Sequence, residues 1–422
     1  MPALRSRPAA TGQDAPPPET GLAHVATVSF LAGRAAPSGV YWICLAGGVA
    51  LARAALLGGV RRGFGAAAAA ILQTVALMGP ARVNGPLTQA LTAPVIGALH
   101  ARGARLPAQL AACFAIRFAH YTVLNAVFVF IILGGLDAYV GSYEALTGWT
   151  GVLPQGQTAA VVLGLASSVV AAIFYTTIQV LVYLRALGEW PADTPVPGHG
   201  AAAGPSDAAG LGTGSGRFDP RAIALAAVVA TALLLTGTSW PLLLAVSAWL
   251  AVAWVAARAG REAVPLGLAL AAMLAISAFA GTLLAGLGAA EAGRRALRAA
   301  LLVAVATWLR AAAGSDGLRT VFRRVLHRLR RLPSARDAAL VLDGLDPGPR
   351  LLSAGRALVE SLADVPRRPL PIADAVIAWV AGEARAFRAG GDGRTGPRIA
   401  IRARDAVLVA LALAPALVFV GA

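Results

Sequence analysis

The sequence predicts an all-α, polytopic membrane protein. Of the 422 residues, 58% are hydrophobic and only 13% are charged, and the mean hydropathy is +0.70. A soluble chain of this length needs more charge on its surface, whereas repeated long apolar runs are typical of helices that cross a bilayer. No ten-residue segments of alternating hydrophobicity are present, so helices are the remaining way to satisfy the backbone hydrogen bonds in lipid.

The charged residues indicate a membrane partner and not a nucleic acid. The formal net charge is +16, and all 36 basic residues are arginines placed mainly between apolar runs. Juxtamembrane positive charge and the positive-inside rule account for that distribution. Because the chain has no lysine, it cannot contain a P-loop and is not expected to be a P-loop ATPase itself.

Cys44 and Cys113 are the two cysteines, and both lie inside apolar runs. They form neither a disulfide framework nor a metal-ligand spacing, so we predict packing roles for both and no metal site. Residues 1–21 contain three consecutive prolines and lack the apolar core of a signal peptide. We expect this segment to be a disordered tail.

A first membrane unit, residues 22–187, is predicted to contain five or six spans. The apolar runs cover 22–38, 41–58, 64–79, 84–101, 107–134 and 157–187. The first run is short, carries His24 and Arg34, and would otherwise be an interfacial helix. If it spans, every Arg-rich loop except that of Arg82 falls on one side, and the Arg-free acidic loop 135–156 falls on the other. We therefore favour six spans with both ends in the cytoplasm.

A second membrane unit, residues 219–420, follows a Pro- and Gly-rich segment, 188–218, that is predicted to be a flexible linker. The apolar runs of the second unit cover 221–236, 238–258, 265–288, 295–313 and 406–420. These five runs bring the expected total to about 11 spans. Arg294 and Arg295 fall on the outer side by parity, which breaks the positive-inside rule, so we expect them to extend from a helix end towards water.

Residues 319–404 form the one long polar stretch between apolar runs of the second unit, with 17 arginines against 8 acidic residues. Residues 321–332 place five apolar side chains on one helical stripe with arginines opposite, and Pro333 ends the pattern. Two more helices are predicted at 350–363 and 372–388. The stretch is expected to be cytoplasmic, either as a docking platform for a cytosolic partner or as a basic layer on anionic lipid.

The order of short motifs in the second unit resembles the transmembrane T component of energy-coupling factor (ECF) transporters. The motifs are Phe218-Asp219-Pro220-Arg221 before the first span, Arg323-Arg324 with Leu332-Pro333 after the fourth, Glu383-Ala384-Arg385-Ala386-Phe387-Arg388, and Arg402-Ala403-Arg404-Asp405 before the last span. The resemblance covers about residues 217–420. It implies that residues 22–187 are a fused substrate-binding S component.

The resemblance implies a membrane permease subunit of an ABC-type importer for a vitamin or related micronutrient, in the bacterial cytoplasmic membrane. It implies two separate cytosolic ATPases that bind the ATP, so this chain would be neither an enzyme nor the holder of a cofactor. Ala384, Arg385 and Ala386 would dock an ATPase through a planar guanidinium flanked by small residues.

A second docking motif is expected upstream of the first. Its nearest candidate is Gly355-Arg356-Ala357, which lies closer to the other motif than the family pattern requires. Either one coupling helix is degenerate, or it docks differently.

Polar residues within the first unit are candidates for a substrate site, because such residues tend to face the interior of a membrane protein. The main candidates are Asn84, Thr88, Gln89, Tyr121, Asn125 and Trp149, followed by Gln73, Thr92, His120, Tyr175, Thr176, Thr177 and Gln179. For each of them, hydrogen bonding between helices is the alternative role. Trp149 is expected in an outer loop that covers the site.

Two other functions are compatible with less of the sequence. One is a permease of another class, or a scaffold, without an ATPase partner, which would fit the incomplete first motif. The other is a membrane-bound enzyme, but the apolar runs contain no paired carboxylates, histidine cluster or Ser/His/Asp set. The scarcity of acidic residues in those runs also argues against a proton-driven carrier.

Overall fold

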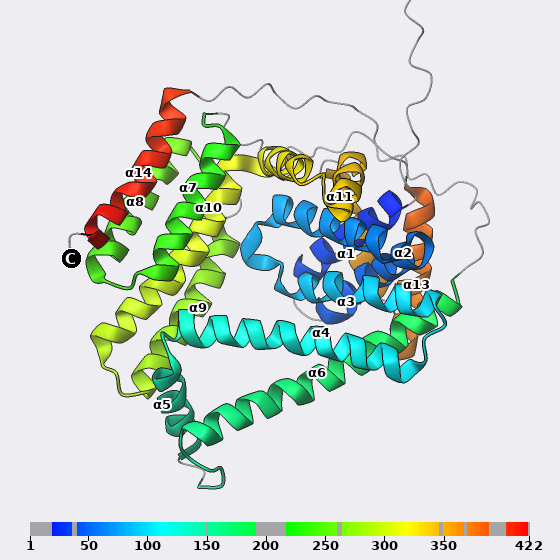
Figure 1. Cartoon of the computed structure of the whole chain (residues 1–422), viewed down its shortest axis with the longest axis horizontal. Helices are drawn as coiled ribbons and strands as arrows, with labels where there is room; N and C mark the ends of the chain where they lie inside the picture. Colours follow the sequence, from blue (N-terminus) through cyan, green and yellow to red (C-terminus); the bar gives the residue numbers. More distant parts are fainter. Residues whose placement is uncertain are drawn as a thin grey trace, which may run out of the picture.

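The computed structural model describes residues 19–35, 40–148, 151–190, 217–259, 264–345, 349–363, 365–366, 369–387 and 402–420. Over these residues the chain is helical and contains no strand (Figure 1), which confirms the predicted all-α class. Among the described residues, six helices are long and apolar enough to cross a membrane, as expected of a multi-pass membrane protein. The total of 11 spans stays a prediction, and residues 1–18 and most of the expected linker lie outside the described residues.

The first unit contains a bent helix and a helix that the sequence did not predict. Its elements are α1 (Glu19–Ala35), α2 (Val40–Met78), the 3-10 helix η1 (Pro80–Arg82), α3 (Asn84–Ala101), α4 (Leu106–Val127), the π-helix η2 (Phe128–Ile132), α5 (Leu136–Thr147) and α6 (Gln157–Gly188). The runs 41–58 and 64–79 are both parts of α2, which bends at Gly59 (φ 78°, ψ 170°). The expected loop 135–156 contains α5, whose first turn carries Asp137.

The second unit is a bundle that lies at the left of Figure 1. Its helices are α7 (Pro220–Thr236), α8 (Trp240–Ala257), α9 (Val264–Leu284), α10 (Ala289–Arg328) and α14 (Ala403–Val420). Trp308 of α10 is fully buried against Trp249 of α8, with ring centroids 5.3 Å apart in an edge-to-face arrangement. The predicted apolar run 295–313 is only part of α10, which continues past residue 313 with a kink at Gly314 (φ 69°).

Three helices from the polar stretch lie against the first unit (Figure 1), and α11 is also joined to the last turns of α10 by the ion pair of Arg323 with Asp343. They are α11 (Pro333–Gly344), α12 (Pro349–Ala363) and α13 (Pro369–Ala386). Ion pairs join them to the first unit: the Nε of Arg61 lies 3.0 Å from an Asp337 oxygen, and the Nε of Arg185 lies 3.0 Å from an Asp374 oxygen. The polar stretch is therefore largely helical, as expected, and it covers α1 and α2.

The apolar stripe at the end of α10 is only partly covered. Leu326 is buried, whereas Val325, Leu329 and Leu332 are 47%, 47% and 58% exposed. Arg324, Arg328, Arg330 and Arg331 are their neighbours in the sequence.

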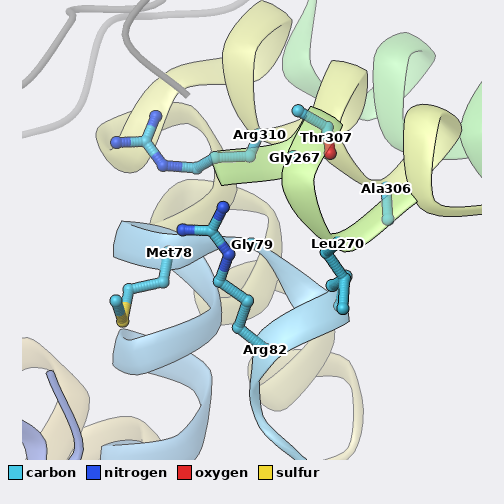
Figure 2. A pocket seen from close by; sticks show the side chains of 9 residues that line it. Met78, Gly79, Arg82, Gly267, Leu270, Ala306, Thr307 and Arg310 are labelled. Carbon is cyan, nitrogen blue, oxygen red and sulfur yellow. The ribbon is translucent and has the colours of Figure 1, made fainter. Parts of the chain in front are cut away.

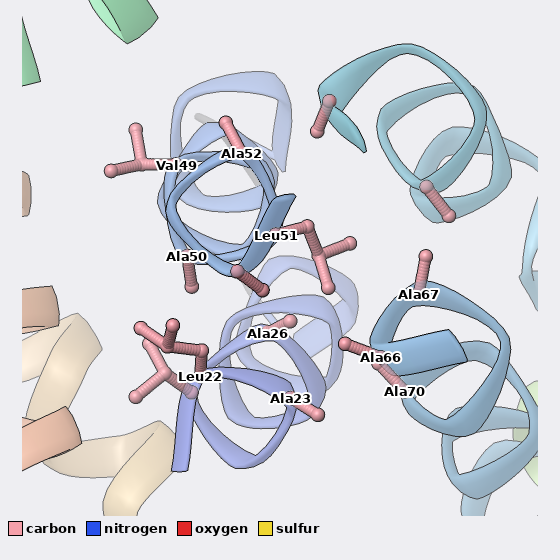
Figure 3. Close-up of a cluster of buried hydrophobic side chains, with 14 of the residues drawn as sticks. Leu22, Ala23, Ala26, Val49, Ala50, Leu51, Ala52, Ala66, Ala67 and Ala70 are labelled. Atoms are coloured by element: carbon pink, nitrogen blue, oxygen red, sulfur yellow. The ribbon is translucent and has the colours of Figure 1, made fainter. Parts of the chain in front are cut away.

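The tightest packing is between α1 and α2. Residues 25–28, a full turn of α1, are each 0% exposed, so α1 is covered on every side. Figure 3 shows Leu22 and Ala26 of α1 among Ala50, Ala66 and other small residues of α2. Small side chains let the helix axes approach closely. Although α1 was favoured as the first span, its 17 residues are not among the six helices that qualify by length and composition.

Arginines of α10 join the two units through main-chain carbonyl groups. Arg298 donates from Nε to Leu234 O (2.6 Å), from Nη2 to Leu235 O (2.9 Å) and from Nη1 to Ile131 O (3.1 Å). Arg310 Nε donates to Leu77 O at 2.8 Å. The guanidinium groups of Arg310 and of Arg82, from η1, line one small pocket between the units (Figure 2).

Arg294 and Arg295 differ from the expectation that they extend towards water. Both pair with Glu291, one turn earlier in α10, and Arg295 also donates to Leu133 O. The two arginines thus share one carboxylate, which compensates part of their charge within the protein.

Candidate functional site

Polar side chains from α3, α4 and α6 meet inside the first unit. We call this group the Arg117 cluster; it comprises Thr88, Gln89 and Thr92 of α3, Cys113, Arg117, His120 and Tyr121 of α4, and Gln179 and Tyr183 of α6. The spacing explains the gathering. Positions four apart along each helix share a face, so the polar residues of each helix point the same way.

Arg117 is the centre of the cluster and is 2% exposed. Its Nη2 donates to Gln179 Oε1, and its Nη1 donates to the Tyr121 hydroxyl at 3.1 Å. Gln179 in turn donates from Nε2 to the Thr92 hydroxyl at 2.6 Å. The guanidinium carbon lies 5.8 Å from the ring centroid of Tyr121 and 5.9 Å from that of Tyr175, within the range of a cation–π interaction.

The hydrogen-bond partners of this charge among the described residues are neutral. Within the described part of the chain, no carboxylate forms an ion pair with Arg117, and its Nε has no hydrogen-bond partner. Placing an arginine at the centre of a span costs about 3 kcal/mol or more, and buried charges in membrane proteins therefore tend to mark functional sites. The cluster can thus receive an anion without first breaking an ion pair.

Two further pairs lie at the edge of the cluster. The Tyr183 hydroxyl donates to Gln89 Oε1 at 2.5 Å, and the Thr88 hydroxyl lies 2.8 Å from His120 Nδ1. Gly48 of α2 makes room for the first pair, because a Cβ there would lie 1.5 Å from the Tyr183 hydroxyl. The Nε2 of His120 is buried without a hydrogen-bond partner among the described residues.

The predicted substrate residues divide between the cluster and other places. Thr88, Gln89 and Tyr121 belong to the cluster. Asn84 is exposed at the start of α3, and Asn125 donates to Ser168 at 2.9 Å instead of joining the cluster. Trp149 lies outside the described residues.

Sequence reasoning missed Arg117 itself. It is the one formally charged residue in the apolar run 107–134, and that isolation was the available signal.

The predicted docking residues of α13 lie at its end, beside α1. His24 of α1 is 3.4 Å from Glu383, and its ring packs against that of Phe387 in a tilted arrangement with centroids 4.6 Å apart. A Cβ on Gly21 would lie 3.2 Å from the Ala384 carbonyl oxygen. Arg385 is half-buried, and the side chain of Ala386 lies outside the described set. The end of α13 is therefore held against α1 while part of Arg385 is accessible.

The second predicted docking motif, Gly355-Arg356-Ala357, is partly buried and partly exposed. Gly355 is buried against α1, and a Cβ there would lie 3.7 Å from the Val28 carbonyl oxygen. Arg356 and Ala357 are exposed. Gly355 is therefore used inside the chain, and the other two residues are accessible.

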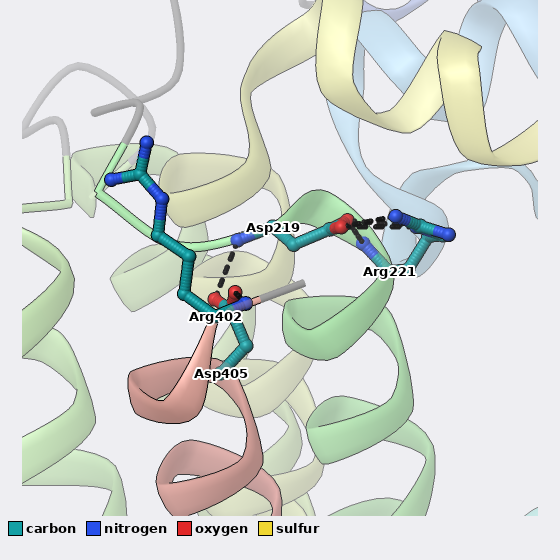
Figure 4. A network of polar contacts seen from close by, with 4 residues as sticks. All are labelled: Asp219, Arg221, Arg402 and Asp405. Atoms are coloured by element: carbon teal, nitrogen blue, oxygen red, sulfur yellow. Dashed lines mark hydrogen bonds and ion pairs between the residues drawn. The ribbon is translucent and has the colours of Figure 1, made fainter. Parts of the chain in front are cut away.

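Two motifs at opposite ends of the second unit come together in a polar network (Figure 4). Asp219 caps α7 by accepting from Arg221 N at 2.8 Å and pairs with the Arg221 guanidinium. Asp405 of α14 accepts from Asp219 N and Arg402 N, both at 2.8 Å. Burial would raise the pKa of Asp219, but hydrogen bonds and the charge of Arg221 outweigh it and hold that pKa below its ordinary value.

Comparison of the chain with protein-family models, with curated proteins and with solved structures finds no match.

Proposed function

We propose that the chain is a permease subunit of an ECF-type importer in a bacterial cytoplasmic membrane. It takes up a vitamin or related small solute, and two separate cytosolic ATPases supply the energy. The observation that carries this proposal is Arg117, a charge buried among neutral polar side chains within apolar helices. Such a group is typical of a solute site in a transporter and serves no evident purpose in lipid anchoring.

The coupling part of the proposal rests on α12 and α13. Both helices present an arginine that a partner can reach, Arg356 and Arg385, and both pack on α1. Since α1 is buried against α2, a force on either helix would be transmitted to the helices beside the Arg117 cluster. This arrangement supports coupling between a cytosolic partner and the solute site.

A scaffold or permease without an ATPase is the second candidate. It is favoured by the burial of Gly355 against α1 and by the packing of α11–α13 on the first unit. In that case these helices would serve only to cover α1 and α2.

Association with ATPases distinguishes the two candidates. The full chain is expressed with the ATPase subunits from its own genome and purified in mild detergent. The proposal expects the subunits to co-purify and the Arg385→Glu variant to retain less than about a tenth of them, since a reversed charge at a docking site costs at least about 1.4 kcal/mol. Arg336→Glu, an exposed reversal on α11, is the matched control and should retain them. Equal retention by both variants would refute the docking role of Arg385, whereas no association of the unaltered chain would favour the scaffold.

A further inference from the structure

The buried arginines of the chain differ in what they bind. Arg298 and Arg310 donate to main-chain carbonyl oxygens at helix ends, which would otherwise lack donors. Arg117 donates only to side chains, Gln179 and Tyr121, and no main-chain carbonyl of the described residues depends on it. A neutral donor could make the same hydrogen bonds to Gln179 and Tyr121 at a smaller free-energy cost of burial than a cation. The fold therefore does not explain why a cation is placed there.

We propose that Arg117 binds the carboxylate of the transported solute, which is therefore a small organic anion. This inference rests on the proposed transport function. A guanidinium presents a planar fork of donors that matches the two oxygens of a carboxylate. At Arg117 the two accepting oxygens of the Gln179 amide and the Tyr121 hydroxyl take the positions that the carboxylate oxygens would occupy, and Nε is free to donate.

The surroundings of Arg117 suit the rest of such a solute. Gln89, Thr92 and Tyr183 provide further amide and hydroxyl groups for hydrogen bonds. The rings of Tyr121 and Tyr175 lie on the guanidinium and would cover the apolar part of the solute next to its carboxylate. When a carboxylate binds, it replaces the Gln179 amide and the Tyr121 hydroxyl as hydrogen-bond acceptors of Arg117, and no ion pair has to be broken.

The test uses the full chain in lipid nanodiscs and pairs of small probes that differ in charge. The probes are acetate with acetamide, benzoate with benzamide, and nicotinate with nicotinamide, each at about 10 mM and at matched ionic strength. The thermal midpoint is followed by tryptophan fluorescence. At least one carboxylate is expected to raise the midpoint by a few degrees, roughly 2–4 °C, more than its amide does.

Three variants decide whether Arg117 is responsible. Arg117→Gln should remove the difference between carboxylate and amide. Gln179→Glu supplies an internal carboxylate, so it should raise the midpoint of the unliganded protein and also remove the difference, which keeps the test decisive if Arg117→Gln does not fold. Arg298→Met removes a buried arginine of the other kind and should lower the midpoint while keeping the difference.

The proposal is overturned if no carboxylate differs from its amide in the unaltered chain, or if the difference persists in Arg117→Gln or in Gln179→Glu. These outcomes are independent of the ATPase experiment. If carboxylates bind but no ATPase associates, the carboxylate site is supported and the importer proposal is refuted. If ATPases associate but no carboxylate binds, only the carboxylate proposal is refuted.

Discussion

Arg298 and Arg117 show that similar burial of one residue type can have different causes. Arg298 is 5% exposed, and its guanidinium donates hydrogen bonds to three carbonyl oxygens, two at the end of α7 and one in η2. Arg117 is 2% exposed, and its guanidinium donates hydrogen bonds to two side chains, those of Tyr121 and Gln179. The first arrangement satisfies the backbone at a junction between the two units, whereas the second leaves a charge available.

Replacing Arg298 with methionine should destabilise the protein by about 2–4 kcal/mol, because three carbonyl groups lose charge-assisted donors in an apolar environment. Chemical unfolding in detergent micelles measures this change. Arg294→Met is the control: Arg294 is more exposed and pairs with Glu291 one turn away, so its loss should cost less than about 1 kcal/mol. Similar losses for the two variants would contradict the structural role of Arg298.

Asp219→Asn should remove a contribution to the free energy of unfolding that depends on pH. Asp219 has a pKa below its ordinary value of 3.8, so it stabilises the folded state above pH 3.8, and this contribution is lost as the pH falls through the lower, folded value. The unaltered chain should be more stable than the variant by about 1–2 kcal/mol at pH 7, because the variant loses the charge that pairs with Arg221, whereas asparagine caps a helix about as well as aspartate. Unfolding measured at pH 7 and again below pH 3 should show the difference shrinking; a constant difference would mean that Asp219 is not ionised in the fold.

At the scale of elements, glycines decide where the long helices bend. Gly59 of α2 and Gly314 of α10 both combine positive φ with ψ near 170°, a conformation that essentially only glycine adopts. The bend in α10 directs its last turns away from the bundle and towards α11 (Figure 1). Without it, α10 would continue along the bundle, and α11 could not reach α2.

Gly314→Ala is therefore expected to destabilise the protein by about 1–3 kcal/mol. It should also weaken the attachment of α11, which can be followed by the yield of a disulfide between cysteines introduced for Arg61 and Asp337, the residues that pair in this structure. Cys44 and Cys113 would first be replaced by alanine. An unchanged melting midpoint and an unchanged cross-linking yield would show that the bend does not depend on glycine.

Two glycines at helix contacts should respond in opposite directions to the same change. Gly48→Ala would place a Cβ against the Tyr183 hydroxyl and should cost about 2 kcal/mol through overpacking. Gly355→Ala meets its nearest atom, Ala32 Cβ, at 3.6 Å, and should be neutral or gain up to about 1 kcal/mol from helix propensity. The melting midpoints of the two variants check this, and a loss at Gly355 equal to that at Gly48 would contradict the described contact of α12 with α1.

At the scale of the whole molecule, the two units form one body through contacts between distant segments. Arg298 reaches Ile131, Arg310 reaches Leu77, and the Ser142 hydroxyl donates to Gly281 O at 2.5 Å. In addition, α11–α13 follow the second bundle in the sequence but cover the first unit. The chain therefore crosses between the units more than once.

These crossings predict that the chain holds together when it is divided. Residues 1–203 and 204–422, co-expressed as separate pieces, should co-purify in mild detergent, because α11–α13 bury apolar surface of α1 and α2. Deleting residues 333–387 from the second piece should reduce the yield of the complex. Separation of the two intact pieces would show that the interface is too weak to persist without the covalent connection.

Sequence alone determined the elements whose signals are local. Apolar runs predicted most of the long helices, Pro333 marked the end of one helical pattern, and the Asp219-Pro220 pair marked the start of α7. A local signal of this kind needs no knowledge of what lies nearby. The helix α11, which begins at Pro333, was not predicted. The predicted loop at 135–156 was wrong over residues 136–147, where α5 forms. The acidic and polar residues of this segment indicated a connection between spans, and its helix-forming residues were overlooked.

Tertiary structure alone decided which side chains meet. Thr88, Gln89 and Tyr121 come from two different helices, and only the packing of α3, α4 and α6 places them around Arg117. Likewise, the packing of α12 on α1 turned Gly355 inwards, and contacts with α1 and α2 placed α11–α13 on the first unit. Helix periodicity fixes the face on which a residue lies, but the free energy of burying that face depends on partners far away in the chain, which no local pattern specifies.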